Sequence, residues 1–328
     1  MTTYKAIKGL SIQTVAGDPS NLALGDIWYD SGAKKIQGAK YAAGSWASSE
    51  DINTARSEAM GSGTNTASLL FGGGGPPPDK LTESFDGSSW TEVGDLNNTH
   101  TTTGGCGTNT ATLAFGTQAP GGGVHGYTES WNGTSWTELS DLNTTRHSGG
   151  SAMAGTTTAA MYIGGTPGNG KTEVEQWDGS SWTETTDINT GRKQVGGAGT
   201  TTDAVLMGGR VGTPQVDETE MWDGSSWTEV ADMGTGRYAG AYAGDSSASG
   251  MFTGGTYPPG QRQAICELWN GTAWAEQGDI SSAREHTCGG GRNTINAWIA
   301  SGSGPPGAAN AGSEVWNAPL AAVSFDTT

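Results

Sequence analysis

Short apolar runs of two or three residues recur at regular intervals along most of the chain, and small or polar residues fill the space between them. None of the runs continues with the three- and four-residue spacing of an amphipathic helix. Short apolar segments bounded by glycine-rich turns are typical of β-strands. The runs are Leu69–Phe71, Leu113–Phe115, Met161–Ile163, Val205–Met207, Met251–Phe252 and Ala297–Ile299. The pattern therefore predicts an all-β protein built from repeated units.

A second repeated feature is a tryptophan that recurs every 44 to 47 residues. An aromatic residue stands five positions before each one, and in five of the six units Asp-Gly or Asn-Gly lies between them. These dipeptides favour tight hairpins because both residues tolerate a positive φ. We therefore expect one hairpin per unit, with an aromatic residue on its first strand and the tryptophan on its second. The tryptophans are Trp46, Trp90, Trp136, Trp182, Trp227 and Trp274, preceded by Tyr41, Phe85, Trp131, Trp177, Trp222 and Trp269.

An arginine and a glutamate also recur once per unit, except that His100 replaces the second arginine. A catalytic site should break the symmetry of a repeat, whereas these residues obey it. Because a guanidinium group suits a carboxylate, we interpret them as structural ion pairs, with an anion-binding ring as the alternative. The arginines are Arg56, Arg146, Arg192, Arg237 and Arg284, and the glutamates are Glu83, Glu129, Glu175, Glu220, Glu267 and Glu314.

Together these features define a four-stranded unit. Strand A follows the arginine, strand B is the apolar run, strand C carries the first aromatic residue and strand D carries the tryptophan. Four strands in each repeat match a propeller blade. The combination of arginine, small residues, apolar strand, Gly-Gly doublet and the hairpin resembles the kelch repeat over about residues 51–318. The resemblance implies a six-bladed kelch-like β-propeller and no particular function.

The sixth unit lacks its own strand D, because Ala318-Pro319 replaces the glycine turn and no tryptophan follows. We expect the missing strand to come from residues 44–50 and to close the ring, and an independent N-terminal hairpin is the alternative. Residues 1–25 are expected to form an arm that docks onto a partner, and residues 26–328 to form the propeller. The expected blades are 51–94, 95–140, 141–186, 187–231, 232–278 and 279–328 plus 44–50.

The composition argues against several classes of protein. Of the 328 residues 56 are Gly and only 33% are hydrophobic, which alone would suggest disorder, but 13 Trp at fixed spacing argue against it. A net charge of −17 without any basic run disfavours nucleic-acid binding. No segment approaches the roughly 20 apolar residues of a membrane helix, and the first residues lack an apolar leader. We therefore expect no membrane insertion.

An enzymatic alternative has little support from the side chains. Galactose-oxidase-like propellers need paired histidines, and His100, His125, His147 and His286 form no such spacing. The segment Ser84–Trp90 comes near the Asp box of sialidases, but Asp boxes are structural. The 33 acidic residues leave a glycosidase pair open, although none stands out. We predict no catalytic residue, no metal site and no cofactor, and keep a carbohydrate-active or galactose-oxidase-like enzyme as the alternative.

The loops between strands B and C vary in length and content, whereas the A–B and C–D turns barely change. In a four-stranded blade the B–C and D–A loops share one face, so one face should be variable. Variable loops on a rigid scaffold commonly carry binding function. The expected contact residues on that face are His125, Tyr127, Arg210, Tyr257 and Arg262, with the proline runs Pro76–Pro78 and Pro258-Pro259.

The segment Leu24–Ser31 resembles the Gly-x-Ile-Trp-Tyr-Asn-type segment of many bacteriophage tail and fibre proteins, and the near-identical repeats resemble kelch-like proteins of marine phages. This resemblance implies a non-enzymatic virion structural protein that is made in the host cytoplasm and present in multiple copies. Its place would be a tail, fibre or appendage, with a capsid-decorating protein as the alternative. The implied partners are other virion proteins and a host-surface glycan or protein.

Overall fold

The computed structural model describes residues 12–74, 80–212, 216–257, 260–304 and 307–325. Over these ranges the chain forms strands, turns and loops, and they include no helix long and apolar enough to cross a membrane. The chain divides into two compact units, Ser45–Asn317 and Met1–Gly44 with Ala318–Thr328. Both expected proline runs, and residues 1–11 of the expected arm, lie outside the described residues.

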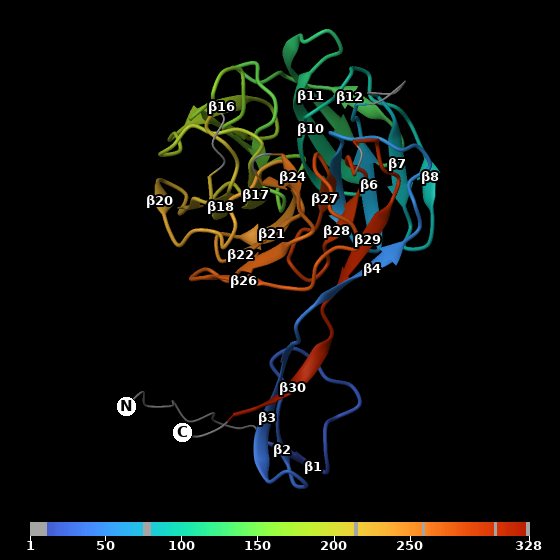
Figure 1. Ribbon diagram of the computed structural model, residues 1–328, viewed down its shortest axis with the longest axis vertical. Helices are drawn as coiled ribbons and strands as arrows, with labels where there is room; N and C mark the ends of the chain where they lie inside the picture. The colour runs from blue at the N-terminus through green and yellow to red at the C-terminus, as the bar shows by residue number, and fades with distance from the viewer. Residues whose placement is uncertain (1–11, 75–79, 213–215, 258–259, 305–306, 326–328) are drawn as a thin grey trace. The chain divides into compact units, whose positions relative to one another are not determined.

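The larger unit contains six four-stranded antiparallel sheets arranged as a ring, which confirms the predicted propeller (Figure 1). The first three blades consist of β5 (Met60–Thr64), β6 (Ala67–Phe71), β7 (Thr82–Phe85) and β8 (Trp90–Glu92); β9 (Gly104–Thr108), β10 (Ala111–Gln118), β11 (Val124–Trp131) and β12 (Trp136–Glu138); and β13 (Gly150–Ser151), β14 (Ala160–Ile163), β15 (Val174–Trp177) and β16 (Trp182–Thr185).

The other three blades have the same order of strands A to D. They consist of β17 (Gly196–Gly199), β18 (Ala204–Met207), β19 (Thr219–Trp222) and β20 (Trp227–Glu229); β21 (Ala241–Ser246), β22 (Ser249–Thr253), β25 (Cys266–Trp269) and β26 (Trp274–Glu276); and β27 (Cys288–Gly290), β28 (Trp298–Ala300), β29 (Ser313–Asn317) and β4 (Ser45–Ser49). A small hairpin, β23 (Thr256–Tyr257) and β24 (Gln261–Arg262), forms the B–C loop of blade 5.

The six A strands surround the centre of the propeller, where each contacts the A strands of both neighbouring blades. This crowding explains the glycine-rich composition of these strands. A Cβ atom added to Gly197 of β17 would lie 2.6 Å from the carbonyl oxygen of Ser151 in β13. A larger residue at this position would therefore push two blades apart.

Ring closure follows the predicted route. Strand β4 pairs with β29 in an antiparallel register that places Trp46 opposite Trp316, with ring centroids 5.3 Å apart. Figure 1 shows this join between the blue β4 and the red β29. The prediction that Tyr41 and Trp46 face each other in one hairpin was wrong, because Tyr41 pairs with Leu320 in the smaller unit. The aromatic partner comes from the opposite end of the chain.

Large aromatic side chains join the blades. Trp90, Trp136, Trp182 and Trp227 are buried, and each lies across the hairpin from the aromatic residue of strand C. The indole Nε1 of Trp136 also donates a hydrogen bond to Thr82 Oγ1 of the preceding blade at 3.0 Å. Each such side chain removes about 150–250 Å² from water, so a few of them build the core despite the low hydrophobic content.

Each blade holds a buried ion pair or its histidine equivalent. Arg56 Nη1 lies 2.5 Å from Glu83 Oε1, and in blade 2 His100 Nε2 lies 3.3 Å from Glu129 Oε1. The contact is single rather than bidentate, because Glu83 Oε2 accepts hydrogen bonds from the backbone and side-chain amides of Asn53. With its guanidinium buried and paired, Arg56 does not face solvent as an anion-binding ring would require. The other pairs are Arg146–Glu175, Arg192–Glu220, Arg237–Glu267 and Arg284–Glu314.

The smaller unit is a separate sheet in the order β1 (Gln13–Val15), β2 (Ile27–Asp30), β3 (Lys35–Tyr41) and β30 (Leu320–Ser324). Its central residue is the buried Trp28. This differs from the expected boundaries, which assigned residues 26–44 and 318–328 to the propeller and residues 1–25 to an arm. The difference arises because β3 pairs with β30 over five residues, so both ends of the chain leave the ring to build one sheet.

Candidate functional site

The two faces of the propeller are built from different loops. In blade 1 the glycine of the C–D turn, Gly87, lies against Thr66 of the A–B turn, and the same contact recurs in the next four blades. On the opposite side Ser57, which follows strand D, forms a β-bridge with Gly74 at the start of the B–C loop, and equivalent bridges occur in every blade. We call the first side the uniform face and the second the variable face.

A closed ring of six backbone hydrogen bonds lies at the centre of the variable face. The N–H of each ring residue donates to the carbonyl oxygen of the equivalent residue in the preceding blade, at distances of 2.7 to 3.0 Å. Each ring residue stands two positions after the repeated arginine, or after His100. The members of this axial ring are Glu58, Thr102, Ser148, Gln194, Ala239 and His286.

All six ring residues have a left-handed backbone, with φ between 51° and 58°. They are six of the eight non-glycine residues with positive φ in the part of the chain that the structure describes. This conformation costs about 1–2 kcal/mol for a residue with a side chain. Because the same conformation recurs in every blade, it belongs to the hydrogen-bonded ring itself, and the ring residues differ from blade to blade in their side chains.

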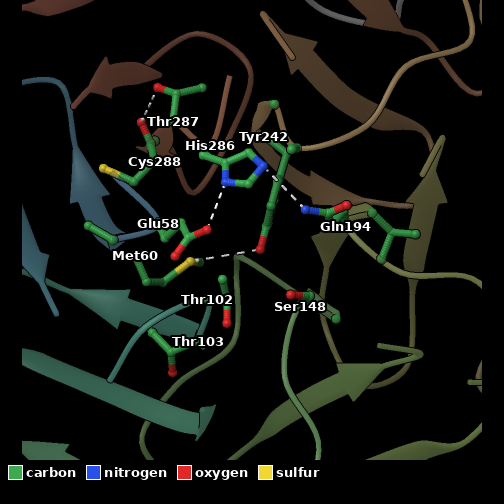
Figure 2. A pocket seen from close by; sticks show the side chains of 16 residues that line it. Glu58, Met60, Thr102, Thr103, Ser148, Gln194, Tyr242, His286, Thr287 and Cys288 are labelled. Atoms are coloured by element: carbon green, nitrogen blue, oxygen red, sulfur yellow. Dashed lines mark hydrogen bonds and ion pairs between the residues drawn. The ribbon is translucent and has the colours of Figure 1, made fainter. Parts of the chain in front are cut away.

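The ring surrounds a pocket with a volume of about 80 Å³, here called the axial pocket (Figure 2). Its walls continue into the first residues of the A strands, and on its floor the hydroxyl of Tyr242 lies 3.8 Å from Met60 Sδ. At the uniform face Arg292 of blade 6 donates a hydrogen bond across the axis to the carbonyl oxygen of Ala154 in blade 3. A void of this size holds several water-sized groups.

A chain of three polar side chains occupies one side of the axial ring. His286 Nδ1 lies 2.9 Å from Glu58 Oε1, and His286 Nε2 lies 3.3 Å from Gln194 Nε2 (Figure 2). An amide nitrogen can only donate, so His286 Nε2 accepts and His286 Nδ1–H donates to Glu58. This hydrogen bond is the main reason that the pKa of Glu58 is lowered, although burial opposes it. Glu58 is therefore a carboxylate at neutral pH.

A second polar group lies on the other side of the ring. His147 Nδ1 lies 3.0 Å from both Thr102 Oγ1 and Ser148 Oγ. Burial lowers the pKa of His147, and Glu58 partly opposes that shift. The neutral imidazole of His147 is therefore favoured.

The five predicted contact residues lie on or beside the B–C loops of blades 2, 4 and 5. His125 stacks on Tyr127 with centroids 4.7 Å apart, and Arg210 covers the ring of Tyr238 at 4.8 Å. Tyr257, at the tip of the small hairpin, is 40% exposed. Beside it Arg262 pairs with Glu285 of blade 6 at 2.8 Å. These residues are held by their neighbours, and the structure does not bring them into one pocket.

Sequence reasoning missed the ring residues, above all Glu58, His286 and His147. The sequence did offer one sign of them. The residue two positions after the repeated arginine is different in each of the six units, while the residues around it repeat. Within the described ranges, no group of three His, Cys, Asp or Glu residues is arranged to hold a metal ion.

Comparison with known proteins supports the fold class. A solved structure described as "Structure of YjhT" matches with a TM-score of 0.66, covering 84% of this chain and 99% of that one. The protein thus belongs to the structural class of β-propellers, and at 13% sequence identity the likeness shows the fold alone. No protein-family model matches the chain. No curated protein is similar to it in sequence.

Proposed function

We propose that this protein is a non-enzymatic component of a phage tail, fibre or appendage, and that it binds a neighbouring virion protein or a host-surface ligand through the variable face of the propeller. The observation that carries the proposal is the contrast between the two faces. The uniform face repeats the same turns around the ring, whereas the variable face combines irregular loops with a polar-rimmed pocket at its centre. Irregular loops on a rigid scaffold are the usual place for recognition.

The smaller unit supports a role in attachment to the particle. The segment Leu24–Ser31, which resembles segments of phage tail and fibre proteins, contributes strand β2 and the buried Trp28. Both chain ends meet in this unit, while the propeller is complete without it. We therefore assign attachment to the smaller unit and ligand recognition to the propeller.

The test uses site-directed blocking of one face at a time. The three native cysteines are buried, and burial raises the pKa of Cys106 to about 12 and those of Cys266 and Cys288 to about 11, so their thiols are unreactive. A single introduced cysteine can then carry a polyethylene glycol maleimide. Tyr257→Cys places this group on the variable face, and Thr272→Cys places it on the uniform face of the same blade.

Binding of each labelled full-length chain to host cells and to particles that lack the protein is then compared with that of the unlabelled variant. The proposal expects the label at position 257 to abolish ligand binding, the label at position 272 to leave ligand binding intact, and neither label to block attachment to particles through the smaller unit. Equal effects of both labels on ligand binding would overturn the assignment to the variable face. Absence of the protein from purified particles by mass spectrometry would overturn the virion role, and turnover of a glycan or an oxidase substrate would overturn the non-enzymatic one.

A further inference from the structure

We infer that the axial pocket binds a primary ammonium group, such as the end of a lysine side chain or the amino group of a small amine. This inference rests on the proposed function, because it takes the variable face as the binding face. It names the chemistry of one subsite on that face. Three properties of the pocket support it: its hydrogen-bond donors, its acceptors and its charge.

The pocket has few free donors. All six backbone N–H groups of the axial ring donate to ring carbonyls, so they form no nest for an anion. The hydroxyls of Thr102, Thr103 and Thr287 donate to the carbonyls of Thr101, Phe115 and Ala300. His286 donates from Nδ1 to Glu58. A phosphate, a sulfate or a carboxylate would therefore find few hydrogen bonds here.

Acceptors remain available. One oxygen of Glu58 accepts from His286, and across the described residues no hydrogen bond reaches the other, Oε2. Among the described residues, the hydrogen-bond partner of Ser148 Oγ is His147 Nδ1. An ammonium group, with three donors and no acceptor, complements this set.

The charge of the surroundings favours a cation. The side chain of Glu58 is about 31% exposed at the rim of the pocket, and burial lowers the pKa of His147 beside it, which favours the neutral imidazole there. Lys193 points its ammonium group away, to the carbonyl oxygen of Gly168. The propeller, residues 45–317, carries 29 acidic and 11 basic residues, a formal charge of −18. This net charge favours cations over anions as ligands of the propeller.

Geometry favours ammonium over guanidinium. Arginine binds a carboxylate best through two parallel hydrogen bonds, which need both carboxylate oxygens. In Glu58 one oxygen is already taken by His286, so a single-point contact remains. A volume of about 80 Å³ also suits a compact head group better than a planar fork or a whole sugar ring.

The test titrates the full-length chain with n-butylamine, the neutral N-butylacetamide and butyrate, followed by NMR or calorimetry. The inference expects n-butylamine to bind and the other two to bind at least about tenfold more weakly, the discrimination expected of one charge-assisted hydrogen bond. Glu58→Gln should weaken n-butylamine binding by about the same factor. The matched control is Glu285→Gln, which removes the same charge from the same face outside the pocket and should leave binding unchanged.

Equal binding of the neutral probe, or unchanged binding in Glu58→Gln, would overturn the inference. Two further arms identify the source of the amine. Acetylating the lysines of the particle should abolish attachment if the ligand is a virion protein, and acetylating the host surface should do so if the ligand is there. If Glu58→Gln leaves attachment intact while the label at position 257 abolishes it, the proposed function stands and the ammonium subsite fails.

Discussion

The repeated arginine and glutamate act at the scale of single residues. In blade 3 the guanidinium of Arg146 is fully buried against Glu175 and also donates to the carbonyl oxygen of Tyr162. Replacing Arg146 with methionine would leave the carboxylate of Glu175 buried without a cation. We expect the free energy of unfolding to fall by about 3–5 kcal/mol, measured by urea denaturation.

The double variant Arg146→Met/Glu175→Leu is the control for this prediction. It removes both charges, so it should be more stable than Arg146→Met alone despite carrying two changes. A single variant that loses less than about 1 kcal/mol would show that the pair does not hold the blade in the way described.

The carboxylates of the C–D turns give a pH prediction. Asp178 Oδ1 accepts hydrogen bonds from the N–H and hydroxyl of Ser180 and from the N–H of Ser181, which lowers the pKa of Asp178 to about 2. Because the folded pKa lies below the usual 3.8, the turn's contribution to stability is full above about pH 4 and is lost as the pH falls through about 2. Carboxyl NMR should find Asp178 titrating near pH 2.

Blade 2 carries a natural control for this turn. There Asn132 Oδ1 accepts the equivalent hydrogen bonds from Thr134 and Ser135 without a titratable group. Asp178→Asn should therefore keep the hairpin and remove its pH dependence between about 2 and 4. An Asp178 that titrates near 3.8 would contradict the hydrogen-bonded turn.

At the scale of elements, ring closure depends on one strand. Strand β4 completes blade 6 from the other end of the chain, whereas the equivalent strand β26 of blade 5 is joined to its own sheet by a tight turn. Trp46→Ala should cost about 3 kcal/mol and should speed hydrogen exchange at the amides of β4 and β29 in particular. Trp274→Ala, the equivalent change in blade 5, should instead speed hydrogen exchange at the amides of blade 5. Similar exchange in both variants would contradict closure by β4.

The sequence was informative for elements because the repeat is local. Each hairpin has its turn residues and its two aromatics within about ten positions, so strands C and D could be anticipated. The pair Arg56–Glu83 could be anticipated because both residues recur once per unit. The closing of blade 6 by residues 44–50 could be anticipated as well, because the sixth unit lacks its own strand D, but the pairing of Tyr41 with Leu320 in a separate sheet could not, because no repeat marks that sheet.

The axial ring was hidden for a related reason. Neighbouring members are 44 to 47 positions apart, and the closing pair, Glu58 and His286, is 228 positions apart; they meet because six blades close at a fixed radius. Their left-handed backbone has no sequence signature either, since glycine occupies none of the six positions. What the sequence does show is that the side chain at this position differs in every unit.

At the scale of the whole molecule, the two units should separate cleanly. All six propeller sheets, including β4, lie within residues 45–317, and the smaller sheet uses residues outside that range. A fragment of residues 45–317 should therefore fold alone, with a Tm within about 5 °C of the propeller transition in the full chain. It should still bind the ligand and should fail to join particles. An unfolded fragment, judged by near-ultraviolet circular dichroism, would show that the smaller unit is needed for the ring.

Hydroxyl-radical footprinting of the protein in purified particles engaged with host cells, compared with the free protein, tests the binding surface most directly. We predict protection on the variable face, at Tyr257 and His125 and around the axial pocket, with the C–D turns such as Asp178–Ser181 left reactive. Protection confined to the uniform face, or no change at the variable face, would contradict the account.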